Sequence, residues 1–426
     1  MFKRHKFFFL ILIIWTLWVT HWAWILPYNM APDECLHFKT AKFFQEEKRL
    51  PVAGKDAITI VKEADCRGTT YIETPFLNYI IASIFINFKN VVRIERDYLA
   101  ARMSSVFFGV IFVSLFYLFL RKIFKNSNFL IYSTLISTIF IPQITYIFAY
   151  VNQEAYSLAS SACLLLVSFI FWQIPLKKEL REKHFLLLGF SVAVHLFSKP
   201  NFYLLFLVPL MVLVFKFWQE KYFPIKNLLI SAILVLLLSG WFFIRNWILY
   251  KDLLGLRTFQ DFYKKNFVTR TFSQAGWNFY DILFKSKWLE ETLSSFYGRF
   301  GYMTIEIDPV MQWIFRGFLF WGLIGLIKKA IDFGRKELFK EEKLFYLLFS
   351  VLIPINVFLS LENSLYFDFQ NQGRYLFPIL IPLMVLVNKG IFGIIKKEEN
   401  QKIATIAIIT GSILLNFWSF IYLPKL

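Results

Sequence analysis

Cysteine and histidine are scarce in this 426-residue sequence, with three and five residues respectively. The three cysteines, Cys35, Cys66 and Cys163, are widely spaced and show no pattern typical of a metal site. So few cysteines also exclude a small disulfide-rich scaffold. Charged residues make up only 18% of the chain, below the roughly 25% of soluble domains, and 29 acidic residues face 47 lysines and arginines.

Apolar residues fill the sequence instead. Hydrophobic residues account for 57% of the chain and aromatic residues for 20%, with a mean hydropathy of +0.53. They gather in blocks such as 7–26, 99–120 and 403–423. Each block is close to the ~20 apolar residues that cross a ~30 Å hydrocarbon core. We therefore predict an all-α polytopic membrane protein, forming one domain over 1–426 without a separate soluble domain.

Eleven segments have the length and composition of membrane spans. They are 7–26, 99–120, 128–149, 154–174, 184–198, 201–218, 227–245, 310–328, 344–361, 376–395 and 403–423. The first segment resembles a signal peptide, but its apolar run is too long and no small-residue cleavage site follows. We expect it to be retained as a span.

Lysine and arginine set the expected orientation. The net charge of +18 lies largely in short loops between the apolar blocks, so it indicates topology and not nucleic-acid binding. It predicts a cytoplasmic N-terminus, in what we expect to be a bacterial inner membrane. Two long loops, 27–98 and 246–309, are then extracytoplasmic. In the first, amphipathic stretches at 32–48 and 75–87 predict helices on the outer membrane surface.

The first outer loop contains the pattern Pro32-Asp33-Glu34-Cys-Leu-His37. Pro32 suits the first position of a helix, which places Asp33 and Glu34 in the first turn, where the helix dipole favours ionised carboxylates. Asp33 and His37 are four residues apart and share a helix face. A carboxylate beside a histidine suits proton abstraction or cation binding. The alternative is an ordinary N-terminal helix turn.

A second set of polar residues lies at the outer ends of the spans. It comprises Asn152, Glu154, Lys199, Arg245, Asn246, Arg299 and Arg374. Basic residues there run against the positive-inside bias, which indicates a bound anion. The alternative is side chains that reach up to the interface.

Cys35 and Cys66 both lie in the first outer loop, where the surroundings are oxidising in many cells. A disulfide between them would close a loop of about 30 residues. Because Cys35 also fits a packed helix face, two free thiols are the preferred expectation.

The ordered motifs of this sequence resemble those of the GT-C polytopic glycosyltransferases, especially protein-mannosyltransferase-like and DUF2142-like membrane proteins. The matching strings are Pro32-Asp-Glu with His37-Phe38, Tyr150-Val-Asn-Gln-Glu154, Phe197-Ser-Lys-Pro200, Trp241 to Tyr250, Ser295-Phe-Tyr-Gly298 and Gln372-Gly-Arg-Tyr-Leu-Phe-Pro378. Two positions depart from the family pattern, because Glu154 replaces a more usual Asp and Lys251 a frequent Gly.

The resemblance implies a GT-C helical core that transfers a sugar from a polyprenyl-phosphate donor to a glycan, lipid or protein acceptor on the outer face. It implies Asp33 as general base, with Glu34 as a second catalytic residue. His37, Asn152 and Glu154 would bind substrate. The donor phosphate would be held by Lys199, Arg245, Arg299 and Arg374.

Two further expectations follow from the resemblance. Since the family has metal-dependent and metal-independent members, a divalent cation on Asp33, Glu34 and Glu154 is left open. Asp33 should be separated from the nearest basic group by about the width of a sugar ring and a phosphate.

Three other functions stay open on the sequence. A transporter or flippase of lipid-linked sugars should show inverted repeats and polar residues near the membrane midplane. We find neither in the sequence. A non-catalytic partner could bind lipid-linked glycan without turnover. A polysaccharide polymerase or ligase would use lipid diphosphate glycans.

Overall fold

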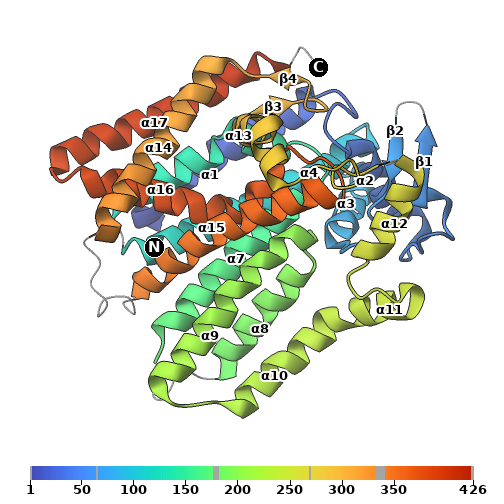
Figure 1. Ribbon diagram of the computed structural model, residues 1–426, viewed down its shortest axis with the longest axis horizontal. Helices are drawn as coiled ribbons and strands as arrows, with labels where there is room; N and C mark the ends of the chain where they lie inside the picture. Colours follow the sequence, from blue (N-terminus) through green and yellow to red (C-terminus); the bar gives the residue numbers. More distant parts are fainter. Residues whose placement is uncertain are drawn as a thin grey trace.

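The computed structural model describes residues 2–63, 66–125, 127–175, 182–267, 270–331 and 341–423. Helices dominate it, and most of them are bundled (Figure 1). Nine helices within these residues are long and apolar enough to cross a membrane: His5–Ile25, Asp97–Ile123, Glu154–Gln173, Pro200–Glu220, Ile225–Tyr250, Pro309–Lys328, Glu342–Tyr366, Gly373–Ile394 and Glu398–Phe420. The predicted all-α polytopic membrane fold is confirmed.

Two of the eleven predicted spans differ from a full-length helix: one is interrupted, and the other is short. The prediction of one continuous span over 128–149 is wrong, because α5 (Asn128–Ile139) ends before Pro142 and a separate short helix, α6 (Pro142–Ile147), follows. Proline has no backbone N–H, so it starts a helix more easily than it continues one. The span predicted at 184–198 is α8 (Glu182–Leu196), whose 15 residues are fewer than a full crossing needs.

Six spans are regular or nearly regular helices. They are α1 (Phe2–Ile25), α4 (Asp97–Ile123), α7 (Glu154–Gln173), α14 (Pro309–Ile331), α15 (Glu341–Tyr366) and α17 (Glu398–Phe420). Glycines allow α14 to approach α16 (Leu380–Ile394) closely. A Cβ atom on Gly325 would lie 2.0 Å from the Gly390 carbonyl oxygen. Such small-residue contacts replace the hydrophobic driving force that helices lack in lipid.

Three spans contain a change of helix type. The 3-10 segment η2 (Pro200–Phe206) leads into α9 (Leu207–Glu220), and the 3-10 segment η6 (Gly373–Ile379) leads into α16. A π-helical turn, η3 (Leu236–Gly240), joins α10 (Ile225–Val235) to α11 (Trp241–Tyr250). Short 3-10 and π segments recur at functional sites. Here η2 and η6 each form the N-terminal end of a span; η2 directly follows Lys199, and η6 contains Arg374.

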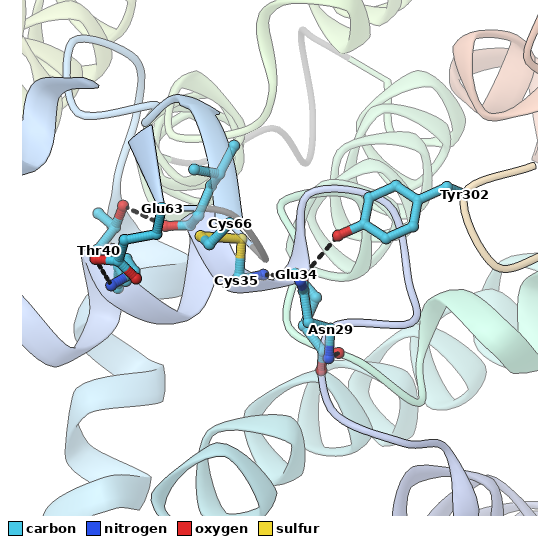
Figure 2. The surroundings of a disulfide bond; sticks show 9 residues. Asn29, Glu34, Cys35, Thr40, Glu63, Cys66 and Tyr302 are labelled. Carbon is cyan, nitrogen blue, oxygen red and sulfur yellow. Dashed lines mark hydrogen bonds and ion pairs between the residues drawn. A yellow bond between two sulfur atoms is a disulfide. The ribbon is translucent and has the colours of Figure 1, made fainter. Parts of the chain in front are cut away.

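The first outer loop folds into helices and a β-hairpin. Its two predicted surface helices are present as α2 (Glu34–Glu47) and α3 (Leu77–Asn87). A 3-10 turn, η1 (Ala57–Thr59), precedes the antiparallel strands β1 (Ile60–Glu63) and β2 (Cys66–Thr69), which the sequence analysis did not predict. Cys35 and Cys66 form a disulfide with Cα atoms 5.9 Å apart (Figure 2). The preferred expectation of two free thiols is therefore wrong, since the packed helix face of Cys35 meets β2.

The second long loop contains two helices, a π-helical turn and two short strands. They are α12 (Leu256–Phe267), the π turn η4 (Asp281–Lys285), α13 (Trp288–Tyr297) and the paired strands β3 (Arg299–Phe300) and β4 (Ile305–Glu306). In Figure 1, α12 lies beside β1 and β2, and β3 and β4 lie near the C-terminal end of the chain. The two long loops therefore share one end of the bundle. Two of the short basic loops that set the expected orientation include residues 176–181 and 332–340, which lie outside the described residues.

Candidate active site at one end of the bundle

Four charged side chains from four separate segments meet at this end of the bundle. An Arg374 Nη2 donates to Asp33 Oδ2 at 3.0 Å, and its Nη1 lies 4.0 Å from Glu154 Oε1. The Lys199 ammonium donates to the same Glu154 oxygen at 2.7 Å. We call Asp33, Glu154, Lys199 and Arg374 the ion cluster. Two acids and two bases balance, as burial of charges at the edge of a membrane core demands.

Asp33 has an unusual backbone conformation. Its φ of 62° and ψ of 7° are left-handed, and α2 begins only at the next residue. The predicted place of Asp33 within the first helical turn is therefore wrong, because the chain turns sharply before the helix. Aspartate adopts this conformation more readily than most residues, and such strain clusters at functional sites.

The Asp33 side chain is partly accessible. It is 27% exposed, and the Tyr71 hydroxyl donates to its Oδ2 at 3.2 Å. Burial raises the pKa of the Asp33 carboxyl, but the Arg374 guanidinium, with His37 and Lys199, outweighs burial and holds it below the ordinary value. The carboxylate is ionised at neutral pH and can still be reached from outside.

The direct Asp33–Arg374 pair contradicts the expected separation by a sugar ring and a phosphate. The reason is physical: a guanidinium that is only 7% exposed needs a partner charge, and two carboxylates are within reach. Residues 33 and 374 nevertheless converge, as the resemblance implied. The pair is closed but solvent-accessible on the aspartate side.

His37 lies behind Asp33 in a stack of rings. Its ring is 4.8 Å from the Tyr71 ring, nearly parallel to it, and its Nδ1 is 2.7 Å from the Tyr79 hydroxyl. Burial lowers the pKa of His37 to about 4, although the carboxylates of Asp33 and Glu154 act in the opposite direction. His37 is therefore neutral at pH 7 and can take part in a hydrogen bond, but it does not add charge.

Several buried polar atoms in and beside the ion cluster lack hydrogen-bond partners among the described residues. Glu154 Oε2, Arg374 Nε and the Tyr150 hydroxyl are buried and have no hydrogen-bond partner among the described residues. The Tyr375 ring lies between the two cations, 5.1 Å from Lys199 Nζ and 5.6 Å from the Arg374 guanidinium carbon. Buried polar atoms without partners are costly, so their concentration here favours a polar ligand.

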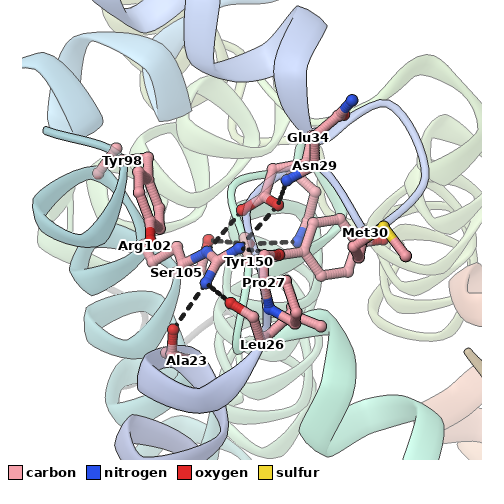
Figure 3. Close-up of polar contacts among 12 residues, drawn as sticks. Ala23, Leu26, Pro27, Asn29, Met30, Glu34, Tyr98, Arg102, Ser105 and Tyr150 are labelled. Atoms are coloured by element: carbon pink, nitrogen blue, oxygen red, sulfur yellow. Dashed lines mark hydrogen bonds and ion pairs between the residues drawn. The ribbon is translucent and has the colours of Figure 1, made fainter. Parts of the chain in front are cut away.

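Glu34, next to Asp33, has a different environment (Figure 3). It is completely buried, and both of its oxygens accept from the Arg102 guanidinium, at 2.6 and 2.8 Å. Arg102 also donates to the backbone carbonyls that end α1, those of Ala23, Leu26 and Pro27. Both Glu34 oxygens are occupied by Arg102, so these contacts give no support to the predicted catalytic role of Glu34, which stays a prediction. The contacts fix the chain just before and after Asp33.

Three other predicted site residues make contacts outside the ion cluster. The Asn152 amide donates to the Ile147 and Tyr150 carbonyls and its oxygen accepts from the Ala155 N–H, so it shapes the turn before α7. Arg299 pairs with Glu306 across the β3–β4 hairpin. Arg245 donates to the Pro51 carbonyl and to Asn246. The Asn152 amide is used by backbone groups, and its predicted role in substrate binding stays a prediction.

Sequence reasoning missed Arg102 and Tyr71. Arg102 had a usable signal, because an arginine four residues into an apolar span needs a buried partner. Tyr71 had none, since its contact with Asp33 bridges two parts of the loop that only folding brings together.

A divalent cation does not fit the carboxylates well. Within the described ranges, no three His, Cys, Asp or Glu side chains are grouped so that they could hold a metal ion. Glu34 is bound to Arg102, and Asp33 and Glu154 each contact a cationic side chain. Two nearby positive charges would repel a metal ion. We derive no step through one.

An apolar cavity of about 620 Å³ opens between the surface helices and the span that contains α11. It is lined mainly by α2, α3, α8 and the η3–α11 junction, with Lys48 and Arg49 at one edge and Phe197 and Phe76 among its walls. Phe197, one of its lining residues, lies two residues before Lys199 in the sequence. We call it the α3–α8 cavity.

No protein-family model and no curated protein matches this sequence. Solved structures do. The chain is similar to ArnT from Cupriavidus metallidurans bound to undecaprenyl phosphate, with 10% identity, a TM-score of 0.53, and coverage of 94% of this chain and 62% of that one. It is also similar to the oligosaccharyltransferase from Archaeoglobus fulgidus tethered to an acceptor peptide, with 11% identity, a TM-score of 0.55, and coverage of 98% and 55%.

Both structures are GT-C membrane proteins, and the chain shares their fold. The predicted GT-C-like helical core is thus confirmed. The chain spans less than two thirds of the length of either structure.

Proposed function

We propose that this protein is a membrane glycosyltransferase that moves a sugar from a polyprenyl-phosphate donor to an acceptor on the extracytoplasmic face. The observation that carries the proposal is the convergence of Asp33 with Arg374, Glu154 and Lys199 on a GT-C fold. The base and the cations for a departing phosphate are both present in one accessible cluster. Its position at one end of the bundle, not at the midplane, favours an enzyme over a transporter.

The proposed reaction begins with the exchange of a partner. The donor phosphate competes with the Asp33 carboxylate for Arg374 and also pairs with Lys199, since arginine and lysine both pair with phosphate. Asp33 released in this way accepts the proton of the acceptor hydroxyl. The hydroxyl oxygen then attacks the anomeric carbon, and the bond between that carbon and the phosphate oxygen breaks.

Polyprenyl phosphate leaves with the electron pair of the broken bond, and Arg374 and Lys199 offset its charge. Glu154 keeps Lys199 in place through their 2.7 Å contact. His37, neutral and stacked on Tyr71, orients the tyrosine hydroxyl that contacts Asp33. The negative charge of Asp33 thus suits proton abstraction, and the positive charges of Arg374 and Lys199 suit the departing phosphate.

The α3–α8 cavity supports a lipid-linked donor. Its walls are mostly apolar, and two of its lining residues, Leu238 and Trp241, belong to Ile225–Tyr250, which is long and apolar enough to cross a membrane. The ArnT structure to which the chain is similar holds undecaprenyl phosphate. A polyprenyl chain in this cavity would place its phosphate end toward Phe197 and Lys199.

The test uses the full-length protein in nanodiscs with undecaprenyl phosphate linked to a radiolabelled hexose or pentose. We expect the wild type to consume the donor in the presence of a membrane-lipid extract and Asp33→Asn to bind it without turnover. Movement of intact donor across the bilayer without consumption would support a flippase and contradict the proposal. If the wild type binds the donor but does not consume it, the protein is a non-catalytic partner and the proposal is wrong.

Orientation has its own test. Lys285, exposed in η4, and Glu399, exposed at the start of α17, belong to opposite ends of the bundle. A single cysteine at Lys285 should react with an impermeant reagent in intact cells, and one at Glu399 should not. The reverse result would place the ion cluster in the cytoplasm.

A further inference from the structure

Glu73 is a buried carboxylic acid that the proposed reaction does not use. It lies in the first long loop, two residues after Tyr71, and is 0% exposed. Neither carboxyl oxygen has a hydrogen-bond partner among the described residues. Burial raises the pKa of the Glu73 carboxyl to about 8; its own backbone N–H acts the other way, and the Asp252 carboxylate adds to the rise. The carboxyl is therefore mostly protonated at pH 7.

The second long loop is attached to the first at the backbone of Glu73. The Asn246 side-chain amide donates to the Glu73 carbonyl oxygen at 2.9 Å. Gly255 lies against the same carbonyl, since a Cβ atom on this glycine would be 2.1 Å from the oxygen and 3.0 Å from Glu73 Cβ. Its φ of +71° also favours glycine. The second loop therefore packs directly on the start of the Glu73 side chain.

This attachment also positions a ring beside Asp33. Helix α12 begins directly after Gly255, and the Phe259 N–H donates to the Gly255 carbonyl at 3.0 Å. The Phe259 ring stacks on the Tyr71 ring, with centroids 5.1 Å apart, and the Tyr71 hydroxyl donates to Asp33. The contact between Gly255 and Glu73 therefore holds α12 next to the tyrosine that contacts the proposed base.

An ionised Glu73 would have no compensating charge. Within the described ranges no cationic side chain is in hydrogen-bond contact with its carboxyl. The titratable groups that face it are Tyr79 on α3, Tyr250 on α11 and Asp252. The Arg245 guanidinium on α11 is engaged elsewhere, by a backbone carbonyl and an amide. Only water could solvate the carboxylate, and water reaches it only if the second loop moves away.

We propose that Glu73 is a positioning residue: its protonated form holds α12 against Tyr71 beside Asp33, and its ionisation in mildly alkaline medium releases α12 and stops sugar transfer. The inference rests on the proposed function and adds its regulation by pH. Glu73 lies outside the ion cluster, so the group that titrates is distinct from the base and from the phosphate-binding cations.

The pH dependence of this contact has a fixed direction. A solvated Glu73 in the open form has the ordinary pKa of 4.5, whereas the buried carboxyl has a pKa of about 8. Between these values, opening releases one proton. The closed form is therefore most stable below pH 4.5, and the equilibrium constant for opening rises about tenfold per pH unit until pH 8. Above pH 8 both forms are ionised and the constant stays level.

Hydrogen exchange of residues 252–263 measures the opening without donor or turnover. The full-length protein in nanodiscs is compared with Glu73→Gln, which is neutral at every pH, and both are measured at the same pH so that intrinsic exchange rates cancel. We expect the opening constant of the wild type, relative to Glu73→Gln, to rise about tenfold per pH unit between pH 5 and 8 and then to level off. A ratio that does not depend on pH would overturn the proposal.

Sugar transfer is measured on the same proteins with the radiolabelled undecaprenyl-phosphate donor. Wild-type turnover should be lower at pH 9 than at pH 6 by about tenfold or more, and Glu73→Gln should remove this fall. Glu63→Gln is the matched control, because Glu63 is an exposed glutamate of the same loop that pairs with Lys39. It should keep the wild-type profile. An equal fall in Glu73→Gln would contradict the positioning role.

Asp252→Asn tests the same claim without altering Glu73. The new amide oxygen can still accept from the Thr258 N–H, as Asp252 does, whereas the lost charge eases ionisation of Glu73 in the closed form. The fall in turnover at alkaline pH should therefore become smaller, and a larger fall would contradict the proposal.

The two measurements separate this inference from the proposed function. If turnover falls through Glu73 while residues 252–263 stay protected, α12 is not released and the inference is wrong. If the wild type transfers no sugar at any pH while the opening still depends on Glu73, the proposed function fails and the pH-dependent contact stands.

Discussion

Asp33 and Glu34 are neighbours in the sequence, carry the same charge and each pair with an arginine, yet their environments differ in almost every other respect. Glu34 and Arg102 are both 0% exposed and are joined by two hydrogen bonds. Asp33 is 27% exposed and shares Arg374 with Glu154. The first pair is saturated and fixes the backbone. The second pair is unsaturated and can exchange its partners.

This comparison separates stability from function within one dipeptide. A buried charge without its partner costs several kcal/mol, whereas an accessible pair contributes about 0–1 kcal/mol. Changes on the Glu34 side should therefore unfold the protein, and changes on the Asp33 side should stop turnover in a folded protein.

The largest effect is expected from Arg102→Met. It leaves the Glu34 carboxylate buried without its partner and frees the carbonyls that end α1, so the folded state should lose about 3–5 kcal/mol. Thermal unfolding in detergent, followed by size-exclusion chromatography, measures the loss. The double variant Glu34→Gln/Arg102→Met removes the stranded charge and should recover part of the stability. Equal stability of wild type and Arg102→Met would break the comparison.

The second-largest effect is expected from Asp33→Asn, which should lower the turnover rate. Removal of a general base should lower turnover by about 10²–10⁴-fold. The unfolding free energy should change far less than in Arg102→Met, because the Asp33 side chain is partly accessible and Glu154 stays within 4.0 Å of the Arg374 guanidinium. Single-turnover kinetics and donor binding separate the two quantities. A variant that is as unstable as Arg102→Met would mean that both pairs are structural.

The disulfide is expected to matter less. Cys35 follows Glu34 directly, so α2 is anchored both by Arg102 and by β2. Cys35→Ser/Cys66→Ser should lower stability by about 2–4 kcal/mol while turnover at low temperature persists, since the Arg102 anchor remains. Loss of turnover at a temperature where the variant is still folded would show that the hairpin, and not Arg102, positions Asp33.

The smallest effect is expected in the pH dependence of folding stability, through His37. In the folded protein the pKa of His37 is lowered by burial to about 4, whereas the unfolded chain has an ordinary value near 6.5. Between these values only the unfolded chain takes up the proton, so stability falls as pH drops from about 6.5 to 4, by at most about 3 kcal/mol.

His37→Gln should flatten this part of the stability profile, with unfolding temperatures measured from pH 4 to pH 8. The Asp33 carboxyl, whose pKa is lowered, contributes stability above its unfolded pKa that is lost only at more acid pH. An unchanged slope in His37→Gln between pH 4 and 6.5 would assign the pH dependence to another group.

Much of the fold could be predicted because bilayer crossing imposes a strong pattern. A run of about 20 apolar residues is visible in sequence without any knowledge of its neighbours. The errors occur where the secondary structure changes over a few residues. Pro142 divides one predicted span, and β1 and β2 are short strands in a polar loop that were not predicted. The site was harder to predict. Glu154, Lys199 and Arg374 were found as separate polar residues at span ends, each with an equally good explanation as an interfacial side chain, and an ordinary N-terminal helix turn was the preferred explanation for the spacing around Asp33.

The sequence by itself determined that the chain is a helical membrane protein and that Asp33, Glu154, Lys199 and Arg374 belong to one end of it, since hydropathy and charge are local properties of the chain. Only the tertiary structure decided which of two adjacent carboxylates is anchored and which is available. Arg102 reaches Glu34 from another helix, and Arg374 reaches Asp33 from a segment 341 residues away. Burial, ion pairing and the left-handed turn at Asp33 arise from these long-range contacts, and they make one carboxylate structural and leave the other accessible.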